Sequence, residues 1–302
     1  MPLFTGLAAF PITPADADGR VDAPALRRLV GRLTAAGVDS IGLLGSTGTY
    51  AYLSRAERRR AIEAVVDEAG GAVPVMAGVG ALRTDAAVAL ARDAKAAGAD
   101  AGLLAPVSYT PLTDEEVFVH FQTVAGESGL PICIYNNPGA THFSFSADLI
   151  VRLSAVPGVV AVKNPAPPAP EVAAQLAGLR TRVPVGFSLG YSGDATAAEP
   201  MIAGADAWHS VLGGLFPEPV LAIVRAAKAG DAAEARRLNA TLAPIWSLFG
   251  EFGGGLRVIY AAASALGLTN AAPPRPILPL PDAAARRVAE AFRALELTQA
   301  TA

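Results

Sequence analysis

Lysine is rare in this chain, and one lysine lies where it could act as a nucleophile. The 302 residues include 24 lysines and arginines, of which only Lys95, Lys163 and Lys228 are lysines. Lys95 and Lys228 occur near the ends of amphipathic runs, where a cation suits the helix dipole and the solvent. Lys163 instead follows the apolar run 159–162. Because burial disfavours the ammonium form and a neutral amine can attack a carbonyl carbon, this position predicts a nucleophile, or else a buried lysine paired with a carboxylate.

Tyr135 ends another apolar run, residues 132–135. A phenol beside a nucleophilic lysine could move protons to and from a carbinolamine. The alternative is a core tyrosine whose hydroxyl group has found a partner. Cys133 shares the strand parity of Tyr135 and is expected to fill the core, because no local feature activates its thiol.

The segment Gly45-Ser46-Thr47-Gly48 follows a third apolar run. Its two glycines allow the backbone to approach a ligand, while successive N–H groups and two hydroxyls can bind a carboxylate or a phosphate. No Gly-Lys-Ser/Thr follows, so the segment is not a P-loop. The pattern indicates an anion-binding turn, and the alternative is an ordinary turn between a strand and a helix.

Two further patterns suggest other chemistry. Residues 186–190 match the G-x-S-x-G turn of serine hydrolases, with Ser188 as the nucleophile, but only His209 follows as a base. The three histidines, His120, His142 and His209, lack metal-ligand spacing, so no metal is predicted. His209 lies in the last apolar run, where it could contact a substrate or be structural.

Composition limits the partners and the location. The chain is 52% hydrophobic and 17% charged, with a net charge of −3 and no basic cluster, which argues against nucleic acid. No apolar run reaches the roughly 18 residues of a membrane helix, and the first residues lack the basic region of a secretory signal. The one cysteine excludes an intramolecular disulfide and fits a reducing compartment. We therefore expect a cytoplasmic globular protein that binds small molecules.

Alternating short apolar and amphipathic runs must position these residues. Residues 35–44, 96–105 and 202–211 repeat one order of helix, glycine, aspartate and strand. Such repetition requires a parallel sheet with right-handed crossovers, and eight strands close a (β/α)8 TIM barrel. An open doubly wound sheet is the alternative, but it usually has a glycine-rich first turn. The predicted strands are 7–13, 40–46, 73–79, 101–107, 131–137, 159–165, 183–189 and 206–212.

The pattern changes after about residue 217. The eighth helix is followed by helical runs at 231–249, 255–267 and 282–297, without a further strand. We expect a barrel over residues 1–230 and a C-terminal helical region, 231–302, packed on it. Barrel enzymes place catalytic groups at the carboxyl ends of the strands, where the candidate residues above occur.

In their order and spacing these motifs resemble the dihydrodipicolinate synthase / N-acetylneuraminate lyase family, over nearly the whole chain. The similar segments are FTGLAAFPITP, GSTG at 45–48, AGVG at 77–80, the loop 106–111, IYNNP at 134–138 and VKNP at 162–165. The resemblance implies a (β/α)8 barrel with C-terminal helices and a homotetramer made of two dimers. It also implies a covalent Schiff base with pyruvate or another 2-keto acid, with no metal or organic cofactor.

The resemblance assigns roles to individual residues. Lys163 would form the Schiff base, and Tyr135 would be the general acid and base near the carboxylate of the keto acid. Gly45, Ser46 and Thr47 would bind that carboxylate, and Thr47 would also relay protons to Tyr135. The protonated imine would act as an electron sink, so that a carbon–carbon bond can break or form.

Several positions depart from the family pattern. Ala140 stands where the lysine-biosynthetic synthase has an arginine for the carboxylate of its second substrate. Ser108, followed by Tyr109, stands where that enzyme lends a relay tyrosine across a dimer interface; we expect both to contact substrate, as we do His209. Thr49 and Asn164 replace acidic residues. Relative to the family pattern, the residues that would bind the keto acid are thus retained, and those that would bind the second substrate have changed.

We therefore expect a class I aldolase or lyase that acts on pyruvate or a sugar-derived 2-keto acid, with an aldehyde as a second reactant. It would cleave or form a carbon–carbon bond, or dehydrate its substrate. One alternative is a true 4-hydroxy-tetrahydrodipicolinate synthase, using pyruvate and aspartate semialdehyde, with an altered acceptor site. The others are a non-catalytic keto-acid sensor and, more remotely, a serine hydrolase using Ser188.

Overall fold

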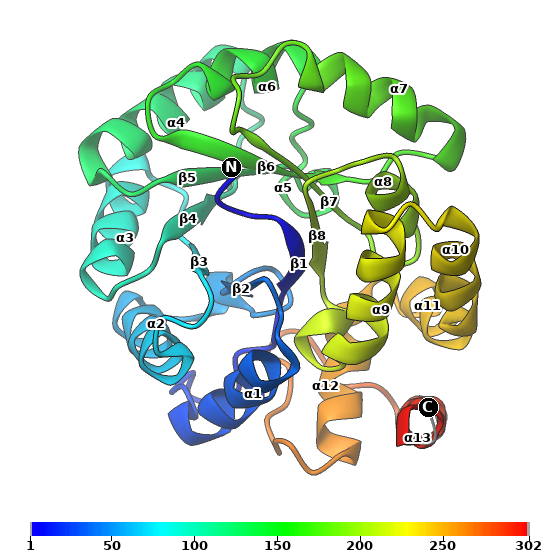
Figure 1. The fold of residues 1–302 in the computed structure, drawn as a ribbon. Helices are drawn as coiled ribbons and strands as arrows, with labels where there is room; N and C mark the ends of the chain where they lie inside the picture. Colours follow the sequence, from blue (N-terminus) through cyan, green and yellow to red (C-terminus); the bar gives the residue numbers. More distant parts are fainter. Residues whose placement is uncertain (1, 301–302) are drawn as a thin grey trace.

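Eight parallel strands close into a barrel in the computed structural model, which describes residues 2–300 and the side chains of residues 2–295 (Figure 1). The strands are β1 Gly6–Ala9, β2 Ser40–Leu43, β3 Val75–Gly78, β4 Ala101–Leu104, β5 Ile132–Tyr135, β6 Val159–Pro165, β7 Ser188–Ser192 and β8 Ala207–Ser210. Neighbours in sequence are neighbours in the barrel, and β8 pairs with β1. The predicted (β/α)8 fold is confirmed.

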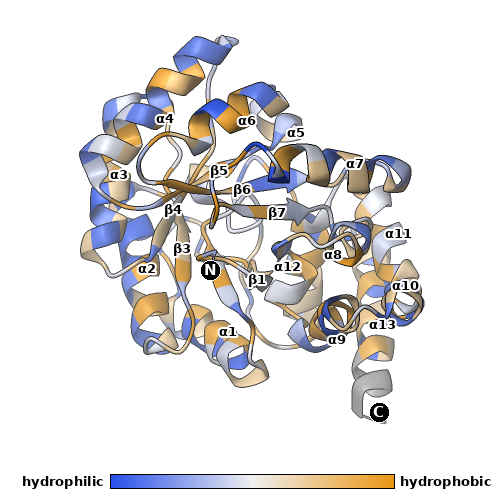
Figure 2. Cartoon of the chain, turned by 45° about the horizontal axis from the view of Figure 1, so that its top comes forward, coloured by the Kyte–Doolittle hydropathy of each residue, from blue (hydrophilic) through white to orange (hydrophobic). Residues whose placement is uncertain are grey.

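Helices surround the barrel, and Figure 2 shows hydrophilic and hydrophobic residues alternating along the outer helices, as expected for amphipathic segments. Among the helices in the described part of the chain, none is long and apolar enough to cross a membrane. The helices are α1 Ala23–Ala36, α2 Arg55–Ala69, α3 Thr84–Ala96, α4 Asp114–Ser128, α5 Pro138–Thr141, α6 Ala147–Ser154, α7 Ala169–Arg180, α8 Ala198–Ile202, α9 Pro217–Lys228, α10 Ala232–Thr241, α11 Ala243–Glu251, α12 Gly255–Ala265 and α13 Asp282–Ala300.

The predicted position of the seventh strand was wrong. It was expected over 183–189, whereas β7 begins at Ser188 and extends to Ser192. The preceding apolar residues form a turn, in which Gly186 has a φ of 91° and the N–H of Phe187 donates to Pro184. Their apolar character made this turn resemble a strand.

The shift of the seventh strand contradicts the serine hydrolase alternative. Ser188 is the first residue of a strand rather than the tip of a strand-to-helix turn, and it is fully buried. Its hydroxyl donates a 2.7 Å hydrogen bond to the carbonyl of Phe4. A hydroxyl group buried at the amino end of the barrel cannot reach a substrate at the opposite end.

The pairing registers arrange the inward side chains in layers. Lys163 lies opposite Gly190, and His209 lies opposite Ala8. In an eight-stranded barrel each layer climbs one residue per strand, so alternate strands supply its four members. One layer therefore consists of Gly42, Leu103, Lys163 and His209, and the next one toward the carboxyl ends consists of Phe10, Gly78, Tyr135 and Ser192. Lys163 and His209 thus share a level inside the barrel.

The helices α10–α13 pack beside the barrel, where α10 contacts α8 and α9, and α12 contacts α13 (Figure 1). Buried residues of these helices, such as Ile245, Val258 and Phe292, belong to the same apolar cluster as the outer faces of the strands. The division of the chain at residues 230 and 231 stays a prediction, because one core spans both parts.

Candidate active site

Lys163 lies within β6 with 4% of its surface exposed. Its Nζ is 3.8 Å from the centroid of the Phe10 ring and 4.4 Å from that of the Tyr135 ring. Within the described part of the chain, none of the ion pairs includes Lys163. The amine therefore faces aromatic rings rather than a carboxylate, which argues for the nucleophile over the paired buried lysine.

The Tyr135 hydroxyl belongs to a connected cluster of polar groups. Tyr135 Oη lies 2.6 Å from Ser46 Oγ, and Asn137 Nδ2 donates to both oxygens, at 3.1 Å and 3.0 Å. Because the amide fills an acceptor site on each oxygen, one hydroxyl donates to the other and the remaining proton is free for a substrate. The cluster can thus hold Tyr135 in place for proton transfer.

Asn137 was missed by sequence reasoning, although it is the second asparagine of the quoted IYNNP motif. The structure shows that it lies two residues after the end of β5 and fixes the Tyr135–Ser46 pair. The hydroxyl that meets Tyr135 among the described residues is that of Ser46. The relay implied for Thr47, which is buried beside it, stays a prediction.

Backbone strain flanks the turn that contains Ser46 and Thr47. Leu44 and Thr49 have φ values of 57° and 54°, a region that residues other than glycine rarely adopt. A Cβ on Gly78 would lie 1.8 Å from the carbonyl oxygen of Leu44, so only glycine permits this close approach. Such strain costs about 1–3 kcal/mol per residue and persists where surrounding structure enforces it, commonly at functional sites.

Asp194, just after β7, ties the last two strands together beside the site. Its carboxylate accepts from Trp208 Nε1 at 3.0 Å and from the N–H groups of Val211 and Leu212 at 3.1 Å and 2.7 Å. Burial raises the pKa of Asp194, and these hydrogen bonds and the Lys163 charge oppose the rise. Sequence reasoning missed this residue, whose one signal is its place after an apolar strand.

The residues expected near a second substrate are not gathered around Lys163 in the single chain. Tyr109 is 98% exposed, and the Ser108 hydroxyl bonds to the carbonyl of Thr110. Asn164 is buried and accepts a 3.0 Å hydrogen bond from Asn136. The contacts of Ser108 and Tyr109 with substrate therefore stay predictions.

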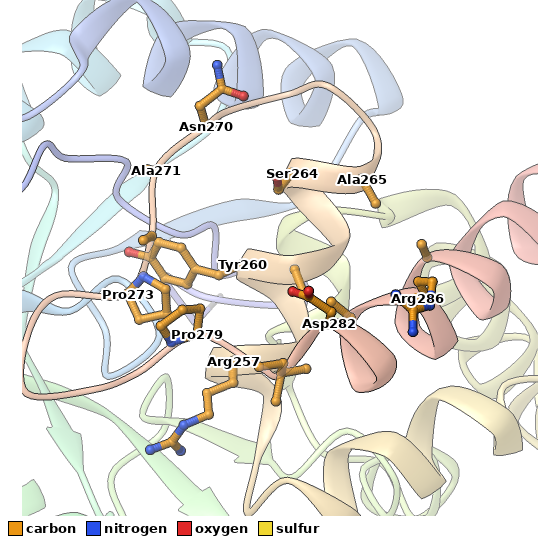
Figure 3. Close-up of a pocket in the computed structure, with 15 residues that line it drawn as sticks. Arg257, Tyr260, Ser264, Ala265, Asn270, Ala271, Pro273, Pro279, Asp282 and Arg286 are labelled. Carbon is orange, nitrogen blue, oxygen red and sulfur yellow. The ribbon is translucent and has the colours of Figure 1, made fainter.

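Within the part of the chain that the structure describes, neither a metal cluster nor a reactive thiol adds to the site. In the described residues no group of three or more His, Cys, Asp or Glu is arranged to hold a metal. Cys133 lies near Lys163, but burial raises the pKa of its thiol to about 12. A cavity of about 440 Å³ lies between α12, α13 and the loop that joins them, lined among others by Arg257, Tyr260, Asp282 and Arg286 (Figure 3). It contains none of the predicted site residues.

Comparison with known proteins identifies the family. The sequence profile of the dihydrodipicolinate synthetase family matches residues 3–295. The chain belongs to this family. A 4-hydroxy-tetrahydrodipicolinate synthase of Thiobacillus denitrificans is 38% identical over 287 residues, which cover 95% of each chain. One of Methylococcus capsulatus is 40% identical over 231 residues, 76% of this chain and 78% of the relative.

Solved structures of the dihydrodipicolinate synthetase family share the fold. A dihydrodipicolinate synthase from Agrobacterium tumefaciens has a TM-score of 0.94 and 58% identity, and the match covers 97% of this chain and 98% of the other. The resemblance predicted from the motifs is confirmed. The family assignment fits a lyase-type enzyme with a lysine Schiff base and without a metal or organic cofactor.

Proposed function

We propose that this member of the dihydrodipicolinate synthetase family is a class I lyase or aldolase that forms a Schiff base between Lys163 and a 2-keto acid, either pyruvate or a sugar-derived acid. One observation carries the proposal. Lys163 is buried without a carboxylate partner among the described residues, next to the hydrogen-bonded group of Tyr135, Ser46 and Asn137. A nucleophile, a proton carrier and polar groups for a carboxylate thus meet at one end of the barrel.

The chemistry follows from these positions. The lone pair of the Lys163 amine attacks the keto carbon, and the nitrogen loses a proton while the keto oxygen gains one, which gives a carbinolamine. Tyr135 carries the proton that lets this hydroxyl leave as water, which yields the protonated imine. The imine withdraws electrons from carbon 3, where loss of a proton or of an aldehyde gives the enamine. Protonation or addition of an aldehyde reverses this step, and hydrolysis releases the product from the amine.

The turn at residues 45–48 is the proposed site for the carboxylate of the keto acid. Gly45 leaves room beside Phe10, since its Cβ would lie 2.9 Å from the ring. Ser46 and Thr47 offer hydroxyl and N–H groups that suit a carboxylate. The strained residues on both sides, Leu44 and Thr49, support a turn that is fixed before the ligand binds.

Reductive trapping tests the Schiff base. The protein is incubated with pyruvate, reduced with borohydride and digested, and the modified peptide is identified by mass spectrometry. We expect modification at Lys163 in the wild type and in Lys95→Arg and Lys228→Arg, and none in Lys163→Arg. These controls are matched because they change the other lysines of the sequence. Absence of a Lys163 adduct with pyruvate and with larger 2-keto acids would contradict the proposal.

A second candidate is synthesis of 4-hydroxy-tetrahydrodipicolinate, since the curated relatives carry that name. The changed position Ala140 argues against it, because an alanine cannot form the charge-assisted pair that an arginine makes with a carboxylate. Product formation from pyruvate and aspartate semialdehyde decides between the two. A rate near background would exclude the synthase, and an adduct without turnover on any keto acid would indicate a keto-acid sensor.

We also propose that the protein is a homo-oligomer, with a tetramer built from dimers as the expected form. Two exposed apolar residues, Leu82 and Val119, line one hollow together with the partly buried Val107 and Leu112. Tyr109 is exposed in the loop between Val107 and Leu112 and is thus available to a second copy. We expect Val119→Asp to lower the mass measured by light scattering, whereas a monomeric wild type would contradict the proposal.

We further propose a cytoplasmic location. Cys133 is a free and buried thiol, which suits a reducing compartment. Cell fractionation with an antibody against the chain tests this proposal, since recovery outside the cytoplasmic fraction would contradict it.

A further inference from the structure

His209 is a buried imidazole without a hydrogen-bond partner at the level of Lys163. One per cent of its surface is exposed, and neither Nδ1 nor Nε2 has a partner among the described residues. Buried polar groups are nearly always hydrogen-bonded, so two orphaned nitrogens on one ring point to a partner that the described residues do not supply. His120 differs in that one of its two nitrogens is paired: Nδ1 bonds to the Thr84 hydroxyl at 2.9 Å, and Nε2 has no partner among the described residues.

The fold makes room for this imidazole. A Cβ on Gly190 would lie 2.3 Å from Nε2 of His209, so the ring occupies the space that any side chain at 190 would fill. Gly190 is the register partner of Lys163, so Nε2 lies close to the backbone opposite the amine. The Phe10 ring packs edge-to-face on the imidazole at 5.7 Å and also faces Lys163 Nζ. Lys163 and His209 therefore share one layer of the barrel and both contact the Phe10 ring.

The charge state of the ring limits what it can bind. Burial, and next the positive charge of Lys163, hold the pKa of His209 well below its usual range, so the imidazole is neutral near pH 7. A neutral imidazole has one N–H donor and one acceptor nitrogen. A hydroxyl group, which both donates and accepts, can pair with either nitrogen, whereas a methyl group pairs with neither.

We propose that His209 binds a hydroxyl group on carbon 3 or carbon 4 of the 2-keto acid attached to Lys163, so that the preferred substrate is a hydroxylated 2-keto acid rather than pyruvate. This inference rests on the Schiff-base function proposed above. A site with an unpaired buried polar group discriminates against a substrate that lacks the matching group, because the polar group then stays desolvated and unpaired. Pyruvate, with its methyl carbon, would leave His209 in that state.

Two pairs of keto acids, each differing by one hydroxyl, test the proposal. They are pyruvate with 3-hydroxypyruvate and 2-ketobutyrate with 4-hydroxy-2-ketobutyrate. The readout is the rate of borohydride trapping at Lys163 at concentrations below saturation. For each pair, the preference is the trapping rate of the hydroxylated acid divided by that of its partner. For at least one pair we expect this preference to be about tenfold higher in the wild type than in His209→Leu. His209→Asn should restore part of the preference, and His120→Leu, remote from Lys163, should keep it.

The outcomes separate this inference from the function on which it rests. Trapping at Lys163 with equal preference in the wild type and in His209→Leu would overturn the role of His209. The Schiff-base function would be unaffected by that result. Water, rather than the substrate, would then be the hydrogen-bond partner of the imidazole. An absence of trapping with all four acids would contradict the Schiff base itself. The variants are compared only after circular dichroism shows wild-type helix content and cooperative melting.

A measurement on the wild type decides the question if both His209 variants fail to fold. The chain has three histidines, so the ring nitrogens of labelled histidine can be assigned by NMR with the variants of the other two. We expect the His209 nitrogen resonances to shift on addition of the hydroxylated acid and to move much less with its partner. Equal shifts with both members of each pair would overturn the proposal.

Discussion

The two sides of Lys163 inside the barrel differ in how their polar groups are paired. Toward β5, the Tyr135 and Ser46 hydroxyls and the Asn137 amide are joined by three hydrogen bonds. Toward β8, the imidazole of His209 has no partner among the described residues. The hydrogen-bonded cluster is fixed before substrate binds, which suits imine formation, a step common to all 2-keto acids. The unpaired imidazole instead discriminates between substrates, because only some of them carry a group that can hydrogen-bond to it.

Removal of the Lys163 amine, which lies between the two sides, should cause the largest loss of activity. Lys163→Arg places a guanidinium at this position, which stays protonated and cannot form an imine. We expect turnover to fall by about a thousandfold or more, while the melting temperature changes little. The measurement is the steady-state rate on the best keto acid, with Lys95→Arg as the control. Retained turnover in Lys163→Arg would mean that neither side of the barrel serves a Schiff base.

Loss of the Tyr135 hydroxyl, on the β5 side, should cause the next largest loss of activity. Tyr135→Phe removes the proton carrier and leaves Ser46 and Asn137 without their shared partner. We expect kcat to fall by about 10²–10⁴-fold for every keto acid, because the proton transfers of imine formation do not depend on the substituent. The control is Tyr191→Phe, which removes an outward hydroxyl bonded to Gln175 at 3.1 Å and should keep kcat. A fall in kcat confined to hydroxylated keto acids would show that the β5 side, like the β8 side, distinguishes between substrates.

A single methyl group should disturb the β8 side. In Gly190→Ala the new Cβ would lie 2.3 Å from Nε2 of His209, so the ring or the strands must move. We expect the free energy of unfolding to fall by about 1–3 kcal/mol, as is usual for overpacking. Gly178→Ala is the control. No neighbour lies within 4 Å of a Cβ there, and alanine should stabilise α7 by about 0.5–1 kcal/mol. Urea unfolding measures both, and an unchanged midpoint in Gly190→Ala would show that the His209 ring is not confined.

The same contrast shows what could be predicted from sequence. The barrel, Lys163, Tyr135 and Ser46 follow from apolar runs and from residues at their ends, because parallel strands bring those ends together. The partners Asn137 and Asp194 could not be predicted, since asparagine and aspartate are common in any turn and their roles depend on contacts between strands.

The pairing of His209 could not be predicted either. The sequence marks it as a candidate contact, but its missing partner depends on the register that sets Gly190 beside it. The seventh strand shows the converse limit, because an apolar turn and an apolar strand have similar compositions. The left-handed φ of Gly186 and the hydrogen bond from the Phe187 N–H to Pro184 mark the turn, and both appear only in the structure.

The smallest expected effect is on the pH dependence of the free energy of unfolding, and it tests whether His209 on the β8 side is unpaired. Burial, followed by the Lys163 charge, lowers the pKa of His209 in the folded state, while the unfolded chain has the ordinary value of about 6.5. The unfolded state therefore binds the proton first, so His209 contributes stability above about pH 6.5 that is lost as the pH falls toward its folded pKa. Replacement by leucine removes this term. We expect the free energy of unfolding of His209→Leu to fall less steeply below pH 6.5 than that of the wild type, by on the order of 1 kcal/mol per pH unit.

Urea unfolding at a series of pH values measures this slope. The pKa of His120 is also lowered by burial, so the wild type and His209→Leu share its contribution and the difference isolates His209. Parallel curves for His209→Leu and the wild type would show that the ring takes up a proton in the folded state as readily as in the unfolded one. In that case the imidazole would have a partner that stabilises its charged form, and the β8 side would be as fully paired as the β5 side.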